Sequence, residues 1–255
     1  MIHGAITGYI DVAQLALYGF WVFFTGLIIY LRREDKREGY PLQNDAGRVK
    51  VQGFPTVPPA KAFRLADGRT VLAPDPTKDE PPINGSPTGY GPGSPLEPIG
   101  NPLLAGVGPG AYTPRGNHPE RNVHGEPLIV PLRAAPGFSV ASGDPDPRGF
   151  SVVGADGISG GTVTELWVDQ AEPMVRYLEV TLLNDTRTVL VPMTMVRIAA
   201  GRGQVVVRSI LGSQFAAVPA IGGRDEVTLA EEDRITAYFG AGTLYAESSR
   251  AEPLL

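Results

Sequence analysis

The stretch VAQLALYGFWVFFTGLIIYL, residues 12–31, holds twenty residues and carries no formal charge. A helix rises about 1.5 Å per residue, so a helix of this length covers about 30 Å, the thickness of the hydrocarbon core of a bilayer. A helix also satisfies its own backbone hydrogen bonds, as lipid requires. Gln14 and Thr25 are the only clearly polar side chains inside the run. The chain is therefore predicted to cross a membrane once, at residues 12–31.

Charged residues on either side of this run predict its orientation. Asp11 and His3 precede it without any Lys or Arg, and four basic residues follow it: Arg32, Arg33, Lys36 and Arg37. Basic residues stay on the cytoplasmic side, which makes residues 1–11 periplasmic and the long C-terminal part cytoplasmic. A secretory signal peptide is the alternative, but its basic residues would precede the apolar core and a cleavage site would follow it.

The composition limits what the remaining part can do. The chain has 255 residues, a net charge of −5 and no cysteine. An acidic chain lacks the basic surface that nucleic acid requires, and the absence of cysteine excludes disulfides and thiolate metal sites. With three His residues, a His-rich metal site is not expected, and no nucleophile, metal set or phosphate loop is found.

Proline divides the chain, because 21 of the 25 prolines lie between Pro41 and Pro147. Residues 32–136 are predicted to be an extended Pro/Gly-rich segment laid over a partner surface, since aromatic and aliphatic residues recur in it. Disorder is the alternative. FRLADGRTVLA within it predicts a β-hairpin with its turn at Asp67-Gly68.

Residues 137–255 read as a mainly β domain. Short strands are predicted at 162–169, 176–183, 187–191, 195–199 and 204–209, with turns at Asn184-Asp185 and at residues 201–203. Thr228 and Glu231 form a capping box that opens a helix, which the glycines at 240 and 242 weaken. The fold class is thus one N-terminal transmembrane helix plus a small antiparallel barrel with a C-terminal helix.

One group of charges has spacing that allows an ion-pair network. Asp169, Glu172 and Arg176 fall in a short connection between two strands. If the two carboxylates are partly buried, they have coupled pKa values and can relay protons. The alternative is an exposed salt bridge beside a turn.

Four segments carry a resemblance to a known family. RREDKREGYPL (32–42), directly after a lone apolar span, resembles the H subunit of the purple-bacterial photosynthetic reaction centre. The other three are similar to the cytoplasmic domain of that family, the PRC-barrel: WVDQAEPMVRYLEV (167–180), VPMTMVRI (191–198) and EVTLAEEDRITAYFGAGTLYA (226–246). The resemblance runs over nearly the whole chain, and the Pro/Gly-rich middle matches more loosely.

The resemblance implies a function. An H subunit is not an enzyme and binds no pigment. It caps the cytoplasmic side of the L and M subunits, which carry bacteriochlorophyll, bacteriopheophytin, quinones and a non-haem iron. It also supports proton delivery to the secondary quinone during light-driven electron transfer. The location implied is the bacterial inner, intracytoplasmic membrane. A cytochrome subunit and light-harvesting 1 polypeptides are further partners that the resemblance brings in.

The resemblance also assigns residues. Asp169, Glu172 and Arg176 would lie on the proton path. The family's His-Gly-His entry motif reads His124-Gly125-Glu126 here, and an acid just before it reads Asn122, which cannot titrate. Glu38 and Tyr40, in the REGYP segment, are expected at the partner interface.

The four basic residues after the span, Arg32, Arg33, Lys36 and Arg37, lie where lipid headgroups would be. An anionic phospholipid such as cardiolipin is an expected ligand there. The alternative is that these residues only set the orientation of the span in the membrane. The remaining alternative for the whole chain is a membrane-anchored PRC-barrel adaptor without a photosynthetic partner.

Overall fold

The computed structural model describes residues 6–7, 10–43, 50–75, 83–89, 94–183 and 185–251. The chain divides into two compact units, residues 1–82 with 89–94 and residues 83–88 with 95–255. Residues 95–136, grouped with the extended segment in the sequence analysis, are thus part of the second unit. Asn184 of the predicted turn, and residues 1–5 and 8–9 of the predicted periplasmic end, lie outside the described residues.

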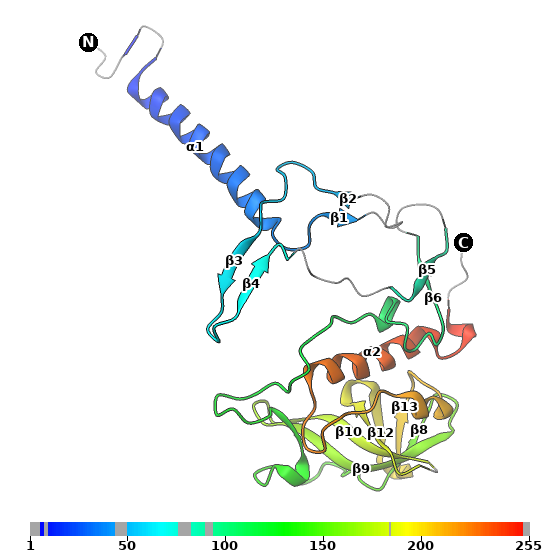
Figure 1. Cartoon of the computed structure of the whole chain (residues 1–255). Coiled ribbons are helices and arrows are strands. Elements are labelled where there is room, and N and C mark those ends of the chain that lie inside the picture. The colour runs from blue at the N-terminus through cyan, green and yellow to red at the C-terminus, as the bar shows by residue number, and fades with distance from the viewer. Residues whose placement is uncertain are drawn as a thin grey trace. The chain divides into compact units, whose positions relative to one another are not determined.

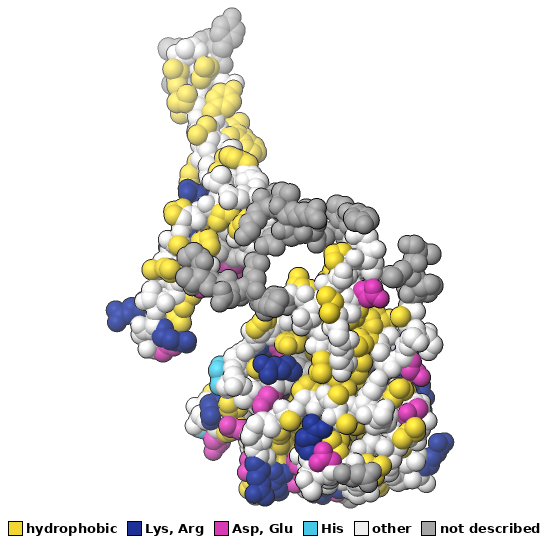
Figure 2. All heavy atoms as spheres, turned by 45° about the vertical axis from the view of Figure 1, so that its right-hand side comes forward, with side chains coloured by type: hydrophobic (Ala, Val, Ile, Leu, Met, Phe, Trp, Pro, Cys, Tyr) yellow, Lys and Arg dark blue, Asp and Glu magenta, His cyan; other side chains and the backbone are white. Residues whose placement is uncertain are grey.

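The first unit is built on α1 (Val12–Asp35) (Figure 1). Asp11 caps it by accepting a hydrogen bond from the Gln14 amide at 2.7 Å, and the Gln14 side chain accepts one from the Asp11 amide. One of the two polar residues in the apolar run therefore serves to start the helix. None of its residues is buried, and apolar side chains line it in Figure 2. By length and composition α1 can cross a membrane.

The helix continues four residues beyond the predicted end at Leu31, because Arg32 and Arg33 in its last turn complement the negative end of the helix dipole. Short strands follow in two antiparallel pairs: β1 (Leu42–Gln43) with β2 (Lys50–Val51), and β3 (Lys61–Arg64) with β4 (Thr70–Ala73). The second pair is the predicted hairpin. Gly68, at φ +86°, forms its turn and donates to the Leu65 carbonyl at 3.0 Å.

The second unit contains a seven-stranded sheet in the order β11-β10-β9-β8-β13-β12, with β7 added along β9. Its strands are β7 (Ile129–Pro131), β8 (Ser151–Val153), β9 (Ser159–Asp169), β10 (Met174–Leu182), β11 (Thr188–Pro192), β12 (Val196–Ala199) and β13 (Gln204–Val207). All neighbours are antiparallel except β13 and β8, which run parallel. The expected all-antiparallel pairing is wrong at this one place, where β13 runs alongside the short strand β8 in the same direction.

The sheet curls. Its two end strands, β11 and β12, follow one another in the chain and are joined by a single 3₁₀ turn, η3 (Met193–Met195). Three residues cannot cross a flat six-strand path at about 4.8 Å per strand. The two ends of the sheet must therefore approach each other, which gives the barrel-like form of the predicted fold class.

Two further parts of the second unit come from the Pro/Gly-rich segment. β5 (Gly85–Pro87) pairs with β6 (Leu96–Pro98), and η1 (Gly108–Gly110) packs against α2 (Leu229–Tyr245). Leu103 and Val107 are 5% and 4% exposed. This stretch is therefore folded into the domain, contrary to the alternative of disorder. The remaining 3₁₀ turns are η2 (Leu132–Ala134), η4 (Ala200–Arg202), η5 (Gly212–Ala217) and η6 (Ser248–Arg250).

Helix α2 lies across the curled sheet (Figure 1) and begins at the predicted capping box, with Thr228 as N-cap and Glu231 as its partner. Gly240 and Gly242 do not end it. A Cβ atom at Gly240 would lie 2.5 Å from the Pro109 carbonyl oxygen, and one at Gly242 would overlap the Ser209 carbonyl. These glycines therefore permit backbone to approach the helix closely, and the packing outweighs their low helix propensity.

The core packs on both faces of the curled sheet, and α2 covers one of them. Its largest fully buried side chains include Trp167, Phe215, Tyr238 and Phe239. The predicted alternation along 176–183 holds for Leu178, Val180 and Leu182, which are buried. Tyr177 on the opposite face is buried as well, because α2 covers that face.

We predict that Gly242→Ala lowers the free energy of unfolding by about 1–3 kcal/mol, since the added methyl group meets backbone that cannot rotate away. Chemical denaturation of the full chain in detergent, followed by near-ultraviolet circular dichroism, measures this. Gly201→Ala is the matched control, because a Cβ there meets no atom within 4 Å. Equal stability of the two variants would contradict the packing role of Gly242.

Candidate functional site

The first candidate site is a collar of charged residues at the end of α1, formed by Glu34, Lys36, Arg37 and Tyr40. Lys36 is 2% exposed, and its ammonium donates to the carbonyl oxygens of Gln52 at 2.5 Å and Pro55 at 2.6 Å. The same ammonium lies 5.1 Å from the centroid of the Tyr40 ring. A buried charge is costly unless it is hydrogen-bonded, and these partners fulfil that condition.

Arg37 fastens the collar to the rest of the first unit. Its guanidinium binds both carboxylate oxygens of Glu34, at 2.8 and 2.9 Å. It also donates to the carbonyl oxygens of Pro59 at 2.7 Å and Ala73 at 3.1 Å. The end of α1 is thus tied directly to the β3–β4 hairpin.

The collar changes the expectation for lipid. Arg32 and Arg33 are exposed, as headgroup contacts require. Lys36 differs from the expectation, because its ammonium is buried on carbonyl oxygens and is not offered to a headgroup. The sequence gives no reason to distinguish the four basic residues. The structure distinguishes Lys36, because the chain folds back and places the carbonyl oxygens of Gln52 and Pro55 against its ammonium group. Of the two predicted interface residues, Glu38 is exposed and Tyr40 is half-buried, with its hydroxyl 3.3 Å from Arg32.

The second candidate site lies at one end of the sheet in the second unit. Asp169 closes β9 and is 5% exposed. One of its carboxylate oxygens accepts from the amides of Ala171 at 2.9 Å and Glu172 at 3.1 Å, and the other lies 4.0 Å from Arg176. Glu172 is exposed, and within the described residues its carboxylate has no hydrogen bond or ion pair. The structure therefore joins Asp169 to Arg176 and leaves Glu172 in solvent.

The loop with the other predicted proton-path residues meets the same end of the sheet. Ile129 pairs with Asp169, and Gln170 binds the carbonyl oxygens of Leu128 and Pro127, both at 2.9 Å. His124 and Glu126 belong to the loop that leads into this pairing and are exposed. All five predicted proton-path residues, Asp169, Glu172, Arg176, His124 and Glu126, thus gather at one end of the sheet.

Asn122 shapes that loop. Its side-chain oxygen accepts from the amides of His124 at 2.9 Å and Glu126 at 3.0 Å, and its amide group donates to the Glu126 carboxylate at 3.0 Å. Arg121 closes the loop by donating to the Gly125 carbonyl at 2.8 Å. Asn122, which has no titratable side chain, therefore fixes the loop that carries His124 and Glu126.

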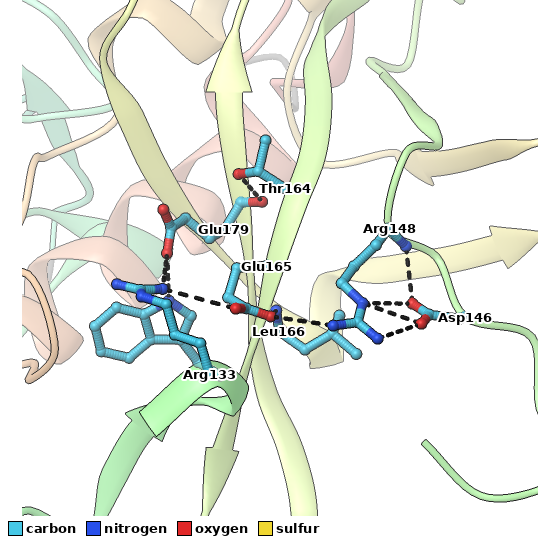
Figure 3. A network of polar contacts seen from close by, with 8 residues as sticks. Arg133, Asp146, Arg148, Thr164, Glu165, Leu166 and Glu179 are labelled. Carbon is cyan, nitrogen blue, oxygen red and sulfur yellow. Dashed lines mark hydrogen bonds and ion pairs between the residues drawn. The ribbon is translucent and has the colours of Figure 1, made fainter. Parts of the chain in front are cut away.

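A network that the sequence analysis missed runs over the sheet itself (Figure 3). Glu165 on β9 lies directly opposite Glu179 on β10, and such like charges repel. Arg133 lies between them, 3.8 Å from Glu165 and 3.5 Å from Glu179, and also binds Asp225 at 2.8 Å. Glu179 accepts from the Trp167 indole at 2.8 Å. The network neutralises two carboxylates on a covered surface.

Arg148 extends this network. It lies 3.7 Å from Glu165 and makes a close ion pair with Asp146, which lowers the pKa of that carboxyl. The signal that could have found Glu165 and Glu179 is the β9–β10 register, which the hairpin fixes. Arg133, Arg148 and Asp225 are remote in sequence and gave no signal.

A buried pair lies next to Arg176. The Tyr177 hydroxyl donates to the Glu232 carboxylate at 2.8 Å, and the two residues are 4% and 8% exposed. Burial raises the pKa of Glu232, against the opposing effects of the Tyr177 hydrogen bond and the Arg176 charge. The sequence analysis placed the residue in the predicted helix and gave it no chemical role.

No group of three or more His, Asp or Glu residues suited to a metal ion occurs in the described part of the chain. The second site therefore combines exposed carboxyl groups and one exposed imidazole with the buried carboxyl groups of Asp169 and Glu232.

Two comparisons with protein families agree with this arrangement. Residues 4–134 match the family model of the photosynthetic reaction centre, H-chain N-terminal region, and residues 140–214 match the PRC-barrel domain. The first match spans more than half of the 255 residues and includes α1 and the collar; the second contains most of the curled sheet. The chain therefore belongs to the photosynthetic reaction centre H-chain family.

Proposed function

We propose that this chain caps the cytoplasmic side of the L and M subunits and carries part of the proton route to the secondary quinone. The observation that supports it best is the gathering of Asp169, Arg176, Glu172, His124 and Glu126 at one end of the sheet. In this proposal residues 1–11 are periplasmic and the barrel domain is cytoplasmic, which follows from the basic residues after α1.

The chemistry defines what these residues have to do. Reduction of a quinone to a quinol takes two electrons and two protons, and the protons must pass the cap. Exposed Glu172, His124 and Glu126 exchange protons with bulk water, since their side chains are open to it. The Asp169–Arg176 pair lies next to them, with its carboxylate buried. This sequence from exposed to buried groups is what a proton entry requires.

We predict that Glu172→Gln slows proton uptake after the second flash about tenfold, equivalent to about 1.4 kcal/mol in the barrier. The first electron transfer stays nearly unchanged, because it needs no proton from this residue. Flash spectroscopy with a pH-indicator dye on the purified complex measures both steps.

Glu97→Gln is the matched control, since Glu97 is an exposed acid on β6, which belongs to a separate two-stranded sheet. Quinol formation at the unaltered rate in the Glu172 variant would remove that residue from the path.

We predict that deleting residues 1–31 prevents stable capping. The helix confines the domain to the membrane, and the resulting high effective concentration is lost without it. Co-purification with the L and M subunits in equal stoichiometry, despite the deletion, would show that the remaining chain suffices.

Near-infrared absorption of the membrane fraction tests the adaptor alternative, which predicts no bacteriochlorophyll with this chain.

An anionic lipid bound by the exposed Arg32 and Arg33, just before the collar, is part of the proposal. We predict that Arg32→Gln lowers the amount of co-purified cardiolipin, because each exposed cation near the surface contributes about 1 kcal/mol of attraction. Lys36→Gln removes the same charge from a buried position and should leave the lipid content unchanged while lowering stability. Equal lipid loss in both variants would place Lys36 among the headgroup ligands.

A further inference from the structure

Glu232 and Tyr177 form a polar pair inside the second unit, where α2 lies on β10. Glu232 is in the first turn of α2, and one of its carboxylate oxygens, Oε2, accepts the hydrogen bond of the Tyr177 hydroxyl. Within the described residues Oε1 accepts no hydrogen bond, and the helix cap is completed by Glu231, whose carboxylate accepts from the Thr228 amide at 2.8 Å. The capping box of α2 therefore does not use the Glu232 carboxyl group.

The charges around this carboxyl come from two neighbouring elements. From β10, the Arg176 guanidinium and the Tyr177 hydroxyl favour its ionised form. From the loop before β7, Arg115 favours the ionised form and Glu120 opposes it. Burial is the largest effect and raises the pKa of Glu232. Opposing effects of this kind bring a carboxyl group closer to a state in which it gains or loses a proton readily.

The position links the pair to the candidate proton entry. Arg176 lies 4.0 Å from Asp169, and its charge also favours the ionised form of Glu232. Tyr177 follows it directly on β10. A structural hydrogen bond alone would be served as well by a glutamine, since a buried ionisable group costs stability that an amide does not.

We propose that Glu232 is an internal proton-binding residue of this domain, exchanging protons with the Asp169–Arg176 pair, and that Tyr177 is its positioning residue. The proton adds to the free oxygen Oε1 when negative charge forms on the quinone and leaves again as the proton moves on. Tyr177 keeps its own proton throughout. This inference rests on the proposed function, because the protons concerned are those on the way to the quinone.

Light-induced infrared difference spectra of the whole complex test it directly. We expect a band of a protonated carboxylic acid that shifts in heavy water and is lost in Glu232→Gln. Tyr177→Phe should keep the band but move its pH midpoint upward, because the lost hydrogen bond favours the ionised carboxylate. Glu97→Gln, again the control, should leave the band unchanged.

A band that persists in Glu232→Gln overturns the proposal. If that variant fails to assemble, Tyr177→Phe decides, and an unmoved pH midpoint overturns the proposal. Failure of the proposed route has a different signature. Glu172→Gln would then leave proton uptake unaltered, whereas the loss of the band in Glu232→Gln would still identify the binding residue.

The raised pKa of Glu232 also predicts a pH dependence of stability. A carboxyl whose pKa is higher in the folded state contributes stability at acidic pH, and that contribution is lost as the pH rises through the folded value. We therefore predict that Glu232→Gln makes the full chain more stable relative to wild type as the pH rises from acidic to neutral. Thermal unfolding across this range measures it, and a constant difference between the two proteins would contradict it.

Discussion

The short connection between β11 and β12 constrains everything else in the second unit. Only the three residues of η3 join strands that stand at opposite ends of the hydrogen-bonded order, so the sheet has to curl until its ends approach. The curl buries Leu166 and Leu178 on one face and leaves α2 to cover the opposite face, which carries Trp167 and Tyr177. It also leaves the β9–β10 turn at a rim, where the 120–128 loop joins it. The candidate proton entry is therefore a consequence of how the sheet closes.

Charges in the two units are treated in three ways, and the differences have functional meaning. Lys36 is buried on carbonyl oxygens, and these contacts hold the collar together. Glu165 and Glu179 are neutralised by Arg133 and fix the sheet surface (Figure 3). Glu232 has a hydroxyl partner and more distant cations, an environment in which proton binding changes the local charge most. As a member of the H-chain family the protein is a structural subunit rather than an enzyme. What its fold provides is the positions of these charged side chains.

Local patterns predicted well what local physics determines. The Asp67-Gly68 turn, the capping box at Thr228 and the apolar run of α1 each depend on residues within a few positions, and each was predicted from the sequence. The misses have a common cause. The roles of Lys36, Glu179 and Glu232 depend on partners at Gln52, Arg133 and Tyr177, which only the tertiary fold brings near. The sequence likewise predicts that Gly240 and Gly242 weaken α2, because the backbone that packs on them at Pro109 and Ser209 is remote in sequence.

Two departures from the family's entry motif are coupled in the structure. By the resemblance given above, the family is expected to have an acid where this chain has Asn122, and a second His where it has Glu126. The Asn122 amide donates to the Glu126 carboxylate at 3.0 Å, whereas an ionised acid at position 122 would place two negative charges at that distance. A carboxylate at 126 therefore goes together with an amide at 122. The oxygen of Asn122 meanwhile accepts the His124 and Glu126 amides, which an acid could also do, so the loop keeps its form. The chain thus has no acid at position 122 but has a carboxyl group at Glu126. The loop with Glu126 leads to the end of β9, where Asp169 is the last residue.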